Sequence, residues 1–183
     1  MNSPEQITIE TPRLILKPLT YEQLFKYLKN DNSLEAELNL NNTERSISPA
    51  LKDALEEAIL PDVSDKNKNY LYSTLWAVIL RSENKMVGDL SFKGEPNEIG
   101  DIEIGYGTYD AFTNNGYMTE AVAGILKWAA AQPGIKQVIA ASEKANIASS
   151  RILEKNNFVR MFESETMYIW GCKIKSSSDH SKV

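Results

Sequence analysis

The chain has 183 residues, a length that suits one domain with a sizeable core. Apolar residues make up 42% and charged residues 25%, and the formal net charge is −5. This charge argues against a nucleic-acid-binding protein, whose surface is usually basic. Cys172 is the only cysteine, which excludes an internal disulfide and a cysteine metal cluster. Because a chain without disulfides suits a reducing compartment, we expect a cytoplasmic protein.

No stretch of the sequence reads as a membrane or signal segment. The first 20 residues carry two acidic residues, two basic residues and three prolines, unlike a signal peptide. The longest strongly apolar run, Leu75–Leu80, is far shorter than the roughly 20 residues that cross a bilayer. We therefore expect neither a membrane nor a nucleic acid among the partners.

The N-terminal part predicts a strand over residues 13–19 and then two helices. Thr20 is a suitable cap for the first helix, and Gln23 stands where a capping box needs a partner. Its apolar positions are Leu24, Phe25, Tyr27 and Leu28. The second helix is predicted over residues 49–60, ending before Pro61.

The C-terminal part predicts strands and two further helices. Strands are expected over residues 75–81, 86–94, 98–109 and 136–142, and two more within 158–174 around a turn near Ser164 and Glu165. Helices are expected over residues 117–131 and 146–156. The longer one has an apolar stripe at helical spacing, formed by Met118, Ala121, Val122, Ile125 and Ala129. We expect one domain over residues 1–175 and a disordered polar tail over 176–183.

This order of elements predicts an α+β (mixed α/β) fold. Its centre is a mostly antiparallel twisted sheet of about seven strands, with helices on both faces. The strands at 98–109 and 136–142 are expected to be parallel, because the helix at 117–131 joins them by a right-handed crossover.

The loop before the longer helix contains Asn114, Asn115 and Gly116, which are poor helix formers. Glycine and asparagine tolerate positive φ, and a helix start exposes unpaired N–H groups and the positive end of the helix dipole. The loop therefore suits a nest of amides around a phosphate. An ordinary surface turn is the alternative that this stretch alone leaves open.

Three stretches together resemble the GNAT N-acetyltransferase superfamily, and in particular its RimJ/RimL-like branch. They are "TPRLILKPLT", "IEIGYGTYDAFTNNGYMTEAV" and "NIASSRILEKNNF", and the resemblance extends over about residues 8–174. Gly116, Thr119, Glu120 and Ala121 match the branch at the loop and helix start. Thr113, Asn114 and Met118 depart from it, and Thr113 replaces a basic or amide residue of the family pattern.

The resemblance implies the GNAT fold and acetyl-coenzyme A as co-substrate, with no metal. The pyrophosphate is expected at the loop before the helix, and the pantetheine arm along "IEIGYGT". A splay between that strand and "KQVIAAS" is expected to admit the thioester. The implied coenzyme-binding residues are Ile104, Tyr106, Gly107, Thr108, Thr113, Asn114, Asn115, Gly116, Tyr117, Met118, Thr119, Asn146 and Ser149.

Acetyl transfer to an amine needs a proton acceptor and a proton donor for the thiolate. We predict Glu103 as the acceptor, because it lies on the strand that the resemblance assigns to the coenzyme. Strand alternation places its side chain on the opposite face from Ile102 and Ile104. Its alternative role is a solvated carboxylate or a partner of Lys or Arg. We predict Ser149 as the donor, because Leu153 stands where many family members have a tyrosine. Its alternative role is hydrogen bonding in the first helical turn.

Several other residues could have either a structural or a functional role. Glu120 lies early in the predicted helix, where the positive end of the helix dipole stabilises a carboxylate, so its expected role is structural. Cys172 and His180 are not expected to be catalytic. The resemblance places the acceptor between the first two helices and the last turn. Acids there are Asp53, Glu56, Glu57, Glu163 and Glu165, which also suit a solvated face. Aromatics that suit either a pocket or the core are Trp76, Tyr106, Tyr109, Phe112 and Trp170.

The predicted function is acetyl transfer from acetyl-coenzyme A to a primary amine of a small molecule, a peptide or a protein N-terminus. The alternative is a coenzyme-binding or regulatory module that has lost catalysis. A general nucleotide-phosphate binder is a third reading. The expected partner is an amine acceptor of unknown identity, and the chain is expected to be a monomer or a homodimer.

Overall fold

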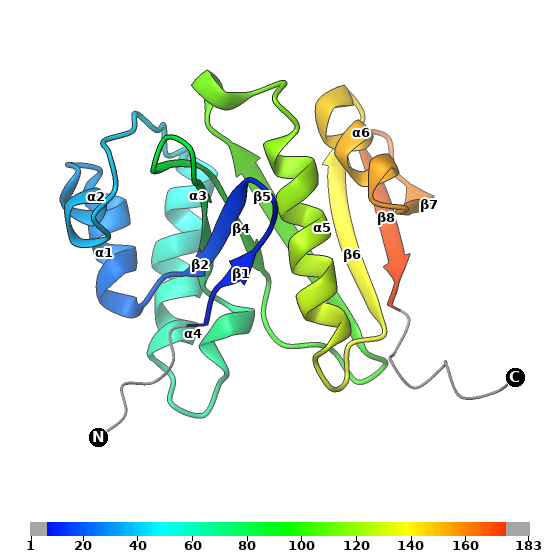
Figure 1. Ribbon diagram of the computed structural model, residues 1–183. Helices are drawn as coiled ribbons and strands as arrows, with labels where there is room; N and C mark the ends of the chain where they lie inside the picture. Colours follow the sequence, from blue (N-terminus) through cyan, green and yellow to red (C-terminus); the bar gives the residue numbers. More distant parts are fainter. Residues whose placement is uncertain (1–6, 175–183) are drawn as a thin grey trace, which may run out of the picture.

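A twisted sheet of eight strands runs through residues 7–174, the part of the chain that this computed structural model describes (Figure 1). The strands are β1 (Ile9–Glu10), β2 (Leu14–Pro18), β3 (Leu75–Leu80), β4 (Lys85–Phe92), β5 (Asp101–Thr108), β6 (Gln137–Glu143), β7 (Val159–Glu163) and β8 (Met167–Lys173). Their order in the sheet is β1-β2-β3-β4-β5-β6-β8-β7. The predicted tail and the outer ends of the predicted domain lie outside the described residues.

All neighbouring strands pair antiparallel except β5 and β6, which pair parallel. The predicted α+β class with a mostly antiparallel sheet and one parallel pair is therefore confirmed. The prediction of about seven strands is one short, because β1 has only two residues and leaves no periodic pattern in the sequence.

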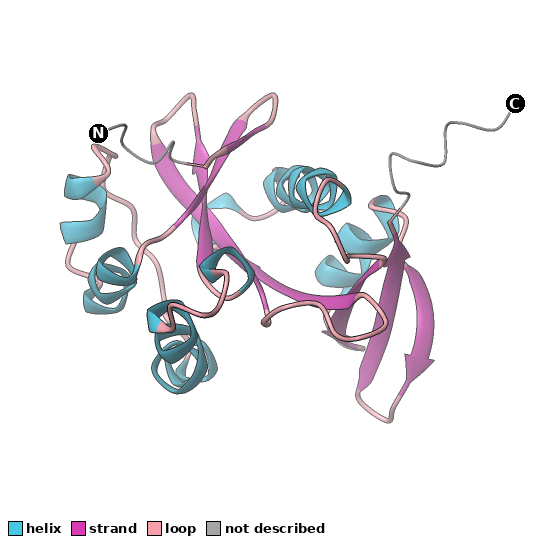
Figure 2. Cartoon of the chain, turned by 90° about the horizontal axis from the view of Figure 1, so that it is seen from below, coloured by secondary structure: helices cyan, strands magenta, loops and turns pink. Residues whose placement is uncertain are grey.

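The helices cover both faces of the sheet (Figure 2). They are α1 (Tyr21–Lys29), α2 (Ser33–Glu37), α3 (Pro49–Ala54), α4 (Leu60–Ser64), α5 (Tyr117–Ala130) and α6 (Ile147–Lys155), with a π-helical turn η1 (Leu55–Ile59) between α3 and α4 and short 3₁₀ turns η2 (Tyr70–Tyr72) and η3 (Asp110–Phe112). The predicted capping box of α1, Thr20 with Gln23, is present. The helix α2 was not predicted. Among residues 7–174, no helix is long and apolar enough to cross a membrane.

The prediction that Pro61 ends the second helix is wrong. The helix continues through α4 to Ser64, because the π-helical turn shifts the hydrogen-bonding register ahead of the proline. The N–H of Leu60 reaches back five residues to the carbonyl of Leu55. Pro61 then stands in the first turn of α4, where a missing N–H is tolerated.

Two apolar layers lie on opposite faces of the sheet. Under α5 and α6, the predicted stripe of α5 is buried, and Ile125 and Val122 are fully inaccessible. Burying a side chain of that size stabilises the fold by roughly 1.5–3 kcal/mol. On the other face, Leu24, Leu55 and Leu60 pack α1 and the α3–α4 helix against the sheet. This second layer forms one wall of the cavity described below.

Candidate active site

The loop before α5 has the left-handed backbone that its sequence predicts. Asn114 has a φ of 63° and Gly116 a φ of 74°. The Asn115 side chain donates back to the carbonyls of Thr113 (2.9 Å) and Phe112 (3.2 Å), which closes the loop on itself. Gly116 caps α5 without any side-chain hydrogen bond, so no side chain occupies the helix start. The first amides of α5 are therefore available to an anion.

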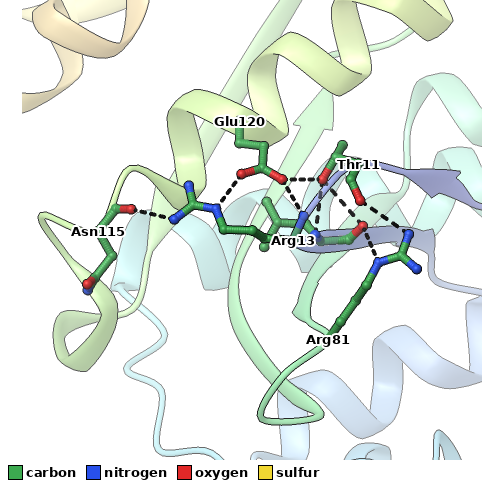
Figure 3. A network of polar contacts seen from close by, with 6 residues as sticks. Thr11, Arg13, Arg81, Asn115 and Glu120 are labelled. Atoms are coloured by element: carbon green, nitrogen blue, oxygen red, sulfur yellow. Dashed lines mark hydrogen bonds and ion pairs between the residues drawn. The ribbon is translucent and has the colours of Figure 1, made fainter.

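Arg13 lies against this loop from the N-terminal segment (Figure 3). Its Nη1 donates to the carbonyl of Asn115 at 3.0 Å, and its guanidinium carbon lies 4.8 Å from the centre of the Tyr117 ring. Its Nε donates to Glu120 Oε2 at 2.6 Å. The opposite oxygen of Glu120 accepts from Thr11 Oγ1 at 2.6 Å and from the Arg13 amide at 2.8 Å. A cationic side chain is thus fixed beside the start of α5.

Glu120 acts as the structural anchor that its position in the helix suggested. Partial burial pushes the pKa of its carboxyl upward, but the hydrogen bonds from Thr11 and Arg13 outweigh burial, so the pKa lies below its usual value. The carboxylate form is the one that joins α5 to the N-terminal segment.

The strands β5 and β6 separate after Ile104. Their parallel pairing extends from Asp101 to Ile104 on β5 and stops there. Beyond that point, Gly105 to Thr108 pair only with β4 on the other side. The edge of β5 that faces β6 therefore has backbone groups without a strand partner, as the predicted splay requires.

Ser149 stands across this opening from β5. Its Oγ lies 2.9 Å from Tyr106 Oη, and its amide donates to Asn146 Oδ1 at 3.0 Å, so Asn146 is the cap of α6. Burial raises the pKa of Tyr106, and the hydrogen bond to Ser149 opposes that shift. Leu153 is fully buried in the core and offers no group for proton transfer.

Glu103 lies on the face of β5 that its alternation predicts. Ile102 and Ile104 point into the core under α5, with 2% of each exposed, while 38% of the Glu103 side chain is accessible on the other face. There the Glu103 carboxylate forms an ion pair with Lys93. The cavity of this face is lined by Lys93 and by Gly105, but not by Glu103 itself.

A cavity of about 520 Å³ opens on this face, between the sheet and the helices α1, α3 and α4. Its apolar wall comes from Leu51, Ala54, Ala58, Ile59, Leu75 and Phe92. Its floor includes Gly105 and Gly107 of β5, and a methyl group added at Gly107 would meet no atom within 4 Å. The two glycines therefore leave the strand accessible from the cavity.

A β-bulge in β4 sets which side chain reaches this floor. Val78 pairs with Gly88 and Ile79 with Met86, so Val87 is the extra residue. Gly88 has no room for a side chain, because an added Cβ would lie 2.4 Å from the carbonyl oxygen of Gly107. After the bulge, the next residue, Asp89, lies opposite Gly107 and lines the cavity.

Asp89 belongs to a buried polar cluster. Its Oδ2 accepts from Tyr27 Oη at 2.7 Å. Arg45 packs over the Tyr27 ring, with 4.7 Å from guanidinium carbon to ring centre, and forms a buried ion pair with Glu35. The buried hydroxyl of Tyr109 lies within hydrogen-bonding reach of Asp89 and Tyr27.

Burial dominates the protonation of this cluster. It raises the pKa of Asp89, against the opposing effects of the Tyr27 and Tyr109 hydroxyls and of the Arg45 charge. Burial and the negative charge of Asp89 raise the pKa values of Tyr27 and Tyr109 as well. Both tyrosines therefore stay neutral, and burial favours the protonated form of Asp89.

The predicted acidic residues of the acceptor side are not brought to the cavity. Glu163 and Glu165 lie at the β7–β8 turn, and the acids of α3 and η1 do not line it. The acids that do line it are Asp62, Asp89 and Asp110. Of the predicted aromatics, Tyr106 and Tyr109 line the cavity, Trp76 and Trp170 are fully enclosed in the core, and Phe112 packs between the two layers.

Sequence reasoning missed Arg13, Tyr27 and Asp89. Asp89 had a visible signal, since it is the one charged residue within "MVGDLSF", a mostly apolar strand. A carboxylate in such a place is rarely buried without a role. Arg13 and Tyr27 carried no such signal, because an arginine just before a strand and a tyrosine on an apolar helix face are ordinary.

Comparison with known proteins agrees with this geometry. Residues 13–159 match the model of the acetyltransferase (GNAT) domain family. The chain is 26% identical over 164 residues to the uncharacterized N-acetyltransferase YjdG of Bacillus subtilis, covering 90% of this chain and 96% of that protein.

Solved structures share the fold at low identity. A ribosomal-protein-S5-alanine acetyltransferase from Vibrio fischeri aligns with a TM-score of 0.68 and 16% identity, over 97% of this chain and 100% of that one. A RimL ribosomal L7/L12 α-N-protein acetyltransferase in complex with coenzyme A aligns with a TM-score of 0.66 and 14% identity, over 92% and 98% of the two chains. With the family match over most of its length, the chain belongs to the GNAT acetyltransferases.

Proposed function

We propose that this acetyltransferase moves the acetyl group of acetyl-coenzyme A directly to a primary amine of a small molecule, a peptide or a protein N-terminus. The observation that carries the proposal is the combination at one end of the sheet. The loop before α5 has left-handed backbone at Asn114 and Gly116, and it follows β5, whose edge has no strand partner after Ile104. A cavity reaches β5 from its other face.

In this proposal the coenzyme lies along the splay between β5 and β6. The pyrophosphate binds the loop and the helix start at Thr113, Asn114, Asn115, Gly116, Tyr117, Met118 and Thr119, through amides other than that of Thr113, which donates to the Asp110 carbonyl. The pantetheine arm pairs with β5 at Ile104, Tyr106, Gly107 and Thr108. Asn146 and Ser149 border the arm from α6. Arg13 supplies the positive charge that Thr113 lacks. Among the structural relatives, RimL is described with coenzyme A and the microcin C7 self-immunity protein MccE with acetyl-coenzyme A and AMP.

The chemical step then needs one proton acceptor and one donor. The amine nitrogen attacks the thioester carbonyl carbon, the C–N bond forms and the C–S bond breaks. Glu103 takes the amine proton through a water molecule after its ion pair with Lys93 opens. Ser149, hydrogen-bonded to Tyr106, gives a proton to the departing thiolate and takes one back from solvent, while Glu103 releases the amine proton to solvent. The reaction needs no metal and no covalent enzyme intermediate.

A specific observation favours the alternative of an inactive coenzyme-binding module. The Glu103 carboxylate is paired with Lys93, and the position of the usual tyrosine is a core leucine, Leu153. Turnover separates the two functions. The assay follows release of the coenzyme A thiol with a panel of primary amines, for the native protein and for Glu103→Gln.

We expect thiol release that depends on an amine, with kcat lowered about 10²-fold or more in Glu103→Gln while acetyl-coenzyme A still binds. Binding of the coenzyme without turnover on any amine would support the inactive module. Unchanged turnover in Glu103→Gln would remove Glu103 as the proton acceptor and leave the acetyltransferase function in place.

A further inference from the structure

Helix α3 and the π-helical turn after it present an apolar stripe to the cavity. Leu51, Ala54 and Ala58 recur at helical spacing, which places them on one side of the helix, and all three line the cavity. The charged residues of α3 and η1 lie outside the cavity lining. Leu55 is fully buried in the core layer, whereas Ala54 and Ala58 are exposed. The core therefore does not cover the apolar surface of this stripe, and a ligand in the cavity can contact it.

The sheet contributes a row of residues to the same cavity. Leu75 of β3 pairs with Ser91 of β4, which pairs with Gly105 of β5, and all three line the cavity. Gly105 follows Ile104, the last residue of β5 that pairs with β6. The proposed proton acceptor, Glu103, stands two residues before Gly105 and so on the same face of β5. The apolar stripe and the start of the splay thus border one cavity.

Asp62 and Lys93 of the cavity lining are paired with other groups of the fold. Asp62 Oδ1 lies 2.6 Å from Lys68 Nζ. Lys93 forms its ion pair with the Glu103 carboxylate. An ammonium or a carboxylate on the ligand would have to break one of these pairs to gain a charged partner here.

Asp89 and Asp110 of the lining also favour a ligand without charge. Asp89 is buried and accepts from Tyr27 Oη at 2.7 Å, and burial raises the pKa of its carboxyl, which favours the uncharged form. Asp110 begins η3 and is exposed, so water solvates its carboxylate. A charged group on the ligand would lose its own hydration on entering the cavity, a cost that an apolar group does not have.

We propose that the acceptor is a primary amine whose remaining part is apolar and uncharged, an alkyl or arylalkyl group that fills the cavity between the apolar stripe and Leu75. This inference rests on the proposed acetyltransferase function and names the class of acceptor for it. The nitrogen lies at the β5 end of the cavity, by Gly105, and the apolar group contacts Leu51, Ala54 and Ala58. A free amine and a peptide N-terminus with an apolar first side chain share this chemistry.

The test measures kcat/KM along the series from 1-aminopropane to 1-aminohexane. We expect kcat/KM to rise about fourfold for each added methylene that the cavity buries. The controls for charge are 1,6-diaminohexane and 6-aminohexanoate, which should be about tenfold or more poorer than 1-aminohexane because their far ends are ionised. Equal kcat/KM along the series in the native protein would overturn the inference, and so would a preference for either charged chain.

Filling the cavity from α3 tests where the apolar group lies. Ala54→Phe should lower kcat/KM for 1-aminohexane about tenfold or more and leave that for 1-aminopropane within about threefold. Asp53→Phe is the matched control, because it adds the same side chain at an exposed neighbour outside the cavity lining and should leave the series unchanged. An unchanged series in Ala54→Phe would overturn the inference. If Ala54→Phe does not fold, by circular dichroism, Leu51→Asn decides, and a series as steep as the native one would overturn it.

Two amino acid amides distinguish the possible sources of the acceptor. Leucinamide should exceed serinamide in kcat/KM, because only its side chain is apolar, and the reverse order would overturn the inference. A higher kcat/KM for leucinamide than for 1-aminohexane would support the inference with a peptide N-terminus as the acceptor. The opposite order would support it with a free amine as the acceptor.

Binding without chemistry distinguishes failure of this inference from failure of the proposed function. The probes are 1-aminohexane and 1-aminopropane in the presence of free coenzyme A, followed by the rise in Tm. A larger rise with 1-aminohexane, lost in Ala54→Phe, supports the apolar site even if no amine is acetylated. Equal rises, together with acetylation of short or charged amines, overturn the apolar site and leave the acetyltransferase standing. No rise and no acetylation overturn both.

Discussion

Two carboxylates on the same face of the sheet, Glu103 and Asp89, lie in opposite surroundings. Glu103 is partly exposed and paired with Lys93, whereas Asp89 is buried and hydrogen-bonded to Tyr27. An exposed carboxylate that can exchange its partner suits proton transfer through water. This difference is the reason to propose Glu103, and not Asp89, as the proton acceptor.

Replacing Asp89 with asparagine should stabilise the free protein at neutral pH. Burial raises the folded-state pKa of Asp89 above its unfolded value, so the folded protein binds the proton more tightly. The favourable contribution is complete below the unfolded pKa and is lost as the pH rises through the folded pKa. Asparagine does not ionise, so Asp89→Asn avoids this loss of unfolding free energy. Each kcal/mol of unfolding free energy regained raises Tm by about 2–4 °C.

Thermal unfolding of both proteins between pH 3 and pH 8 checks this expectation. The Tm of Asp89→Asn should exceed that of the native protein at pH 7–8, and the difference should shrink toward acidic pH. A native protein that is the more stable of the two at pH 8 would mean that the charged Asp89 is already compensated within the fold.

Arg13 should matter for the coenzyme more than for the fold. Its guanidinium contacts the loop carbonyl of Asn115 and stands by the start of α5, where an anion is expected. Arg13→Ala should raise the Kd for acetyl-coenzyme A about tenfold, or about 1.4 kcal/mol, by isothermal titration. Arg81→Ala is the matched control, because Arg81 also holds the N-terminal segment, through Thr11, without contacting the loop (Figure 3). Equal losses in the two variants would reduce Arg13 to an anchor of that segment.

At the scale of elements, Gly116 joins the loop to α5 with a φ of 74°. Alanine is strained there by about 1 kcal/mol, and the strain shifts the amides that the proposal assigns to the pyrophosphate. Gly116→Ala should therefore weaken acetyl-coenzyme A binding and lower Tm slightly. Gly134→Ala supplies the comparison, since Gly134 has a φ of 87° beyond the other end of α5 and open space around it. It should lower Tm by a similar amount and leave coenzyme binding unchanged; a comparable loss of binding would contradict the role of the loop.

The elements differ in how far the sequence reveals them. The helix α5 was predictable to within a residue, because its apolar stripe and Pro133 mark it clearly. The π-helical turn at η1 was not, since it depends on a register shift that makes Pro61 acceptable. The bulge of β4 was hidden for a similar reason, because an extra residue in a strand appears only when its partner is known. That bulge decides where Asp89 points.

The parts of the candidate site also differ in how far the sequence reveals them. The left-handed backbone of the loop before α5 was predictable, because Asn114 and Gly116 are local in sequence and tolerate positive φ. The buried polar cluster beside the cavity was not predictable, because Tyr27, Arg45 and Asp89 come from three distant segments and meet only in the folded sheet. Long-range contacts of this kind leave no periodic signal in one sequence.

At the scale of the whole molecule, the proposed coenzyme site and the cavity both border β5 but lie on different sides of it. Helix α5 lies on one face of the sheet, and α1, α3 and α4 lie on the other (Figures 1 and 2). The strand pairing of β5 and β6 ends at Ile104, and the cavity under α1, α3 and α4 reaches β5 from its other face. Two substrates can therefore bind together without sharing a binding surface. The proposed direct transfer, with no acetylated enzyme, requires both substrates to be bound at once.

The most direct test of the account is a thermal-shift titration with acetyl-coenzyme A, with free coenzyme A and ATP alongside. A ligand at about 100 times its Kd stabilises the fold by about 2.7 kcal/mol, which corresponds to roughly 5–11 °C in a domain of this size. The account predicts a saturating rise with acetyl-coenzyme A and little with ATP. Equal rises with both would indicate a phosphate binder that ignores the pantetheine arm. No rise at millimolar acetyl-coenzyme A would contradict the coenzyme site, and with it the proposed acetyl transfer.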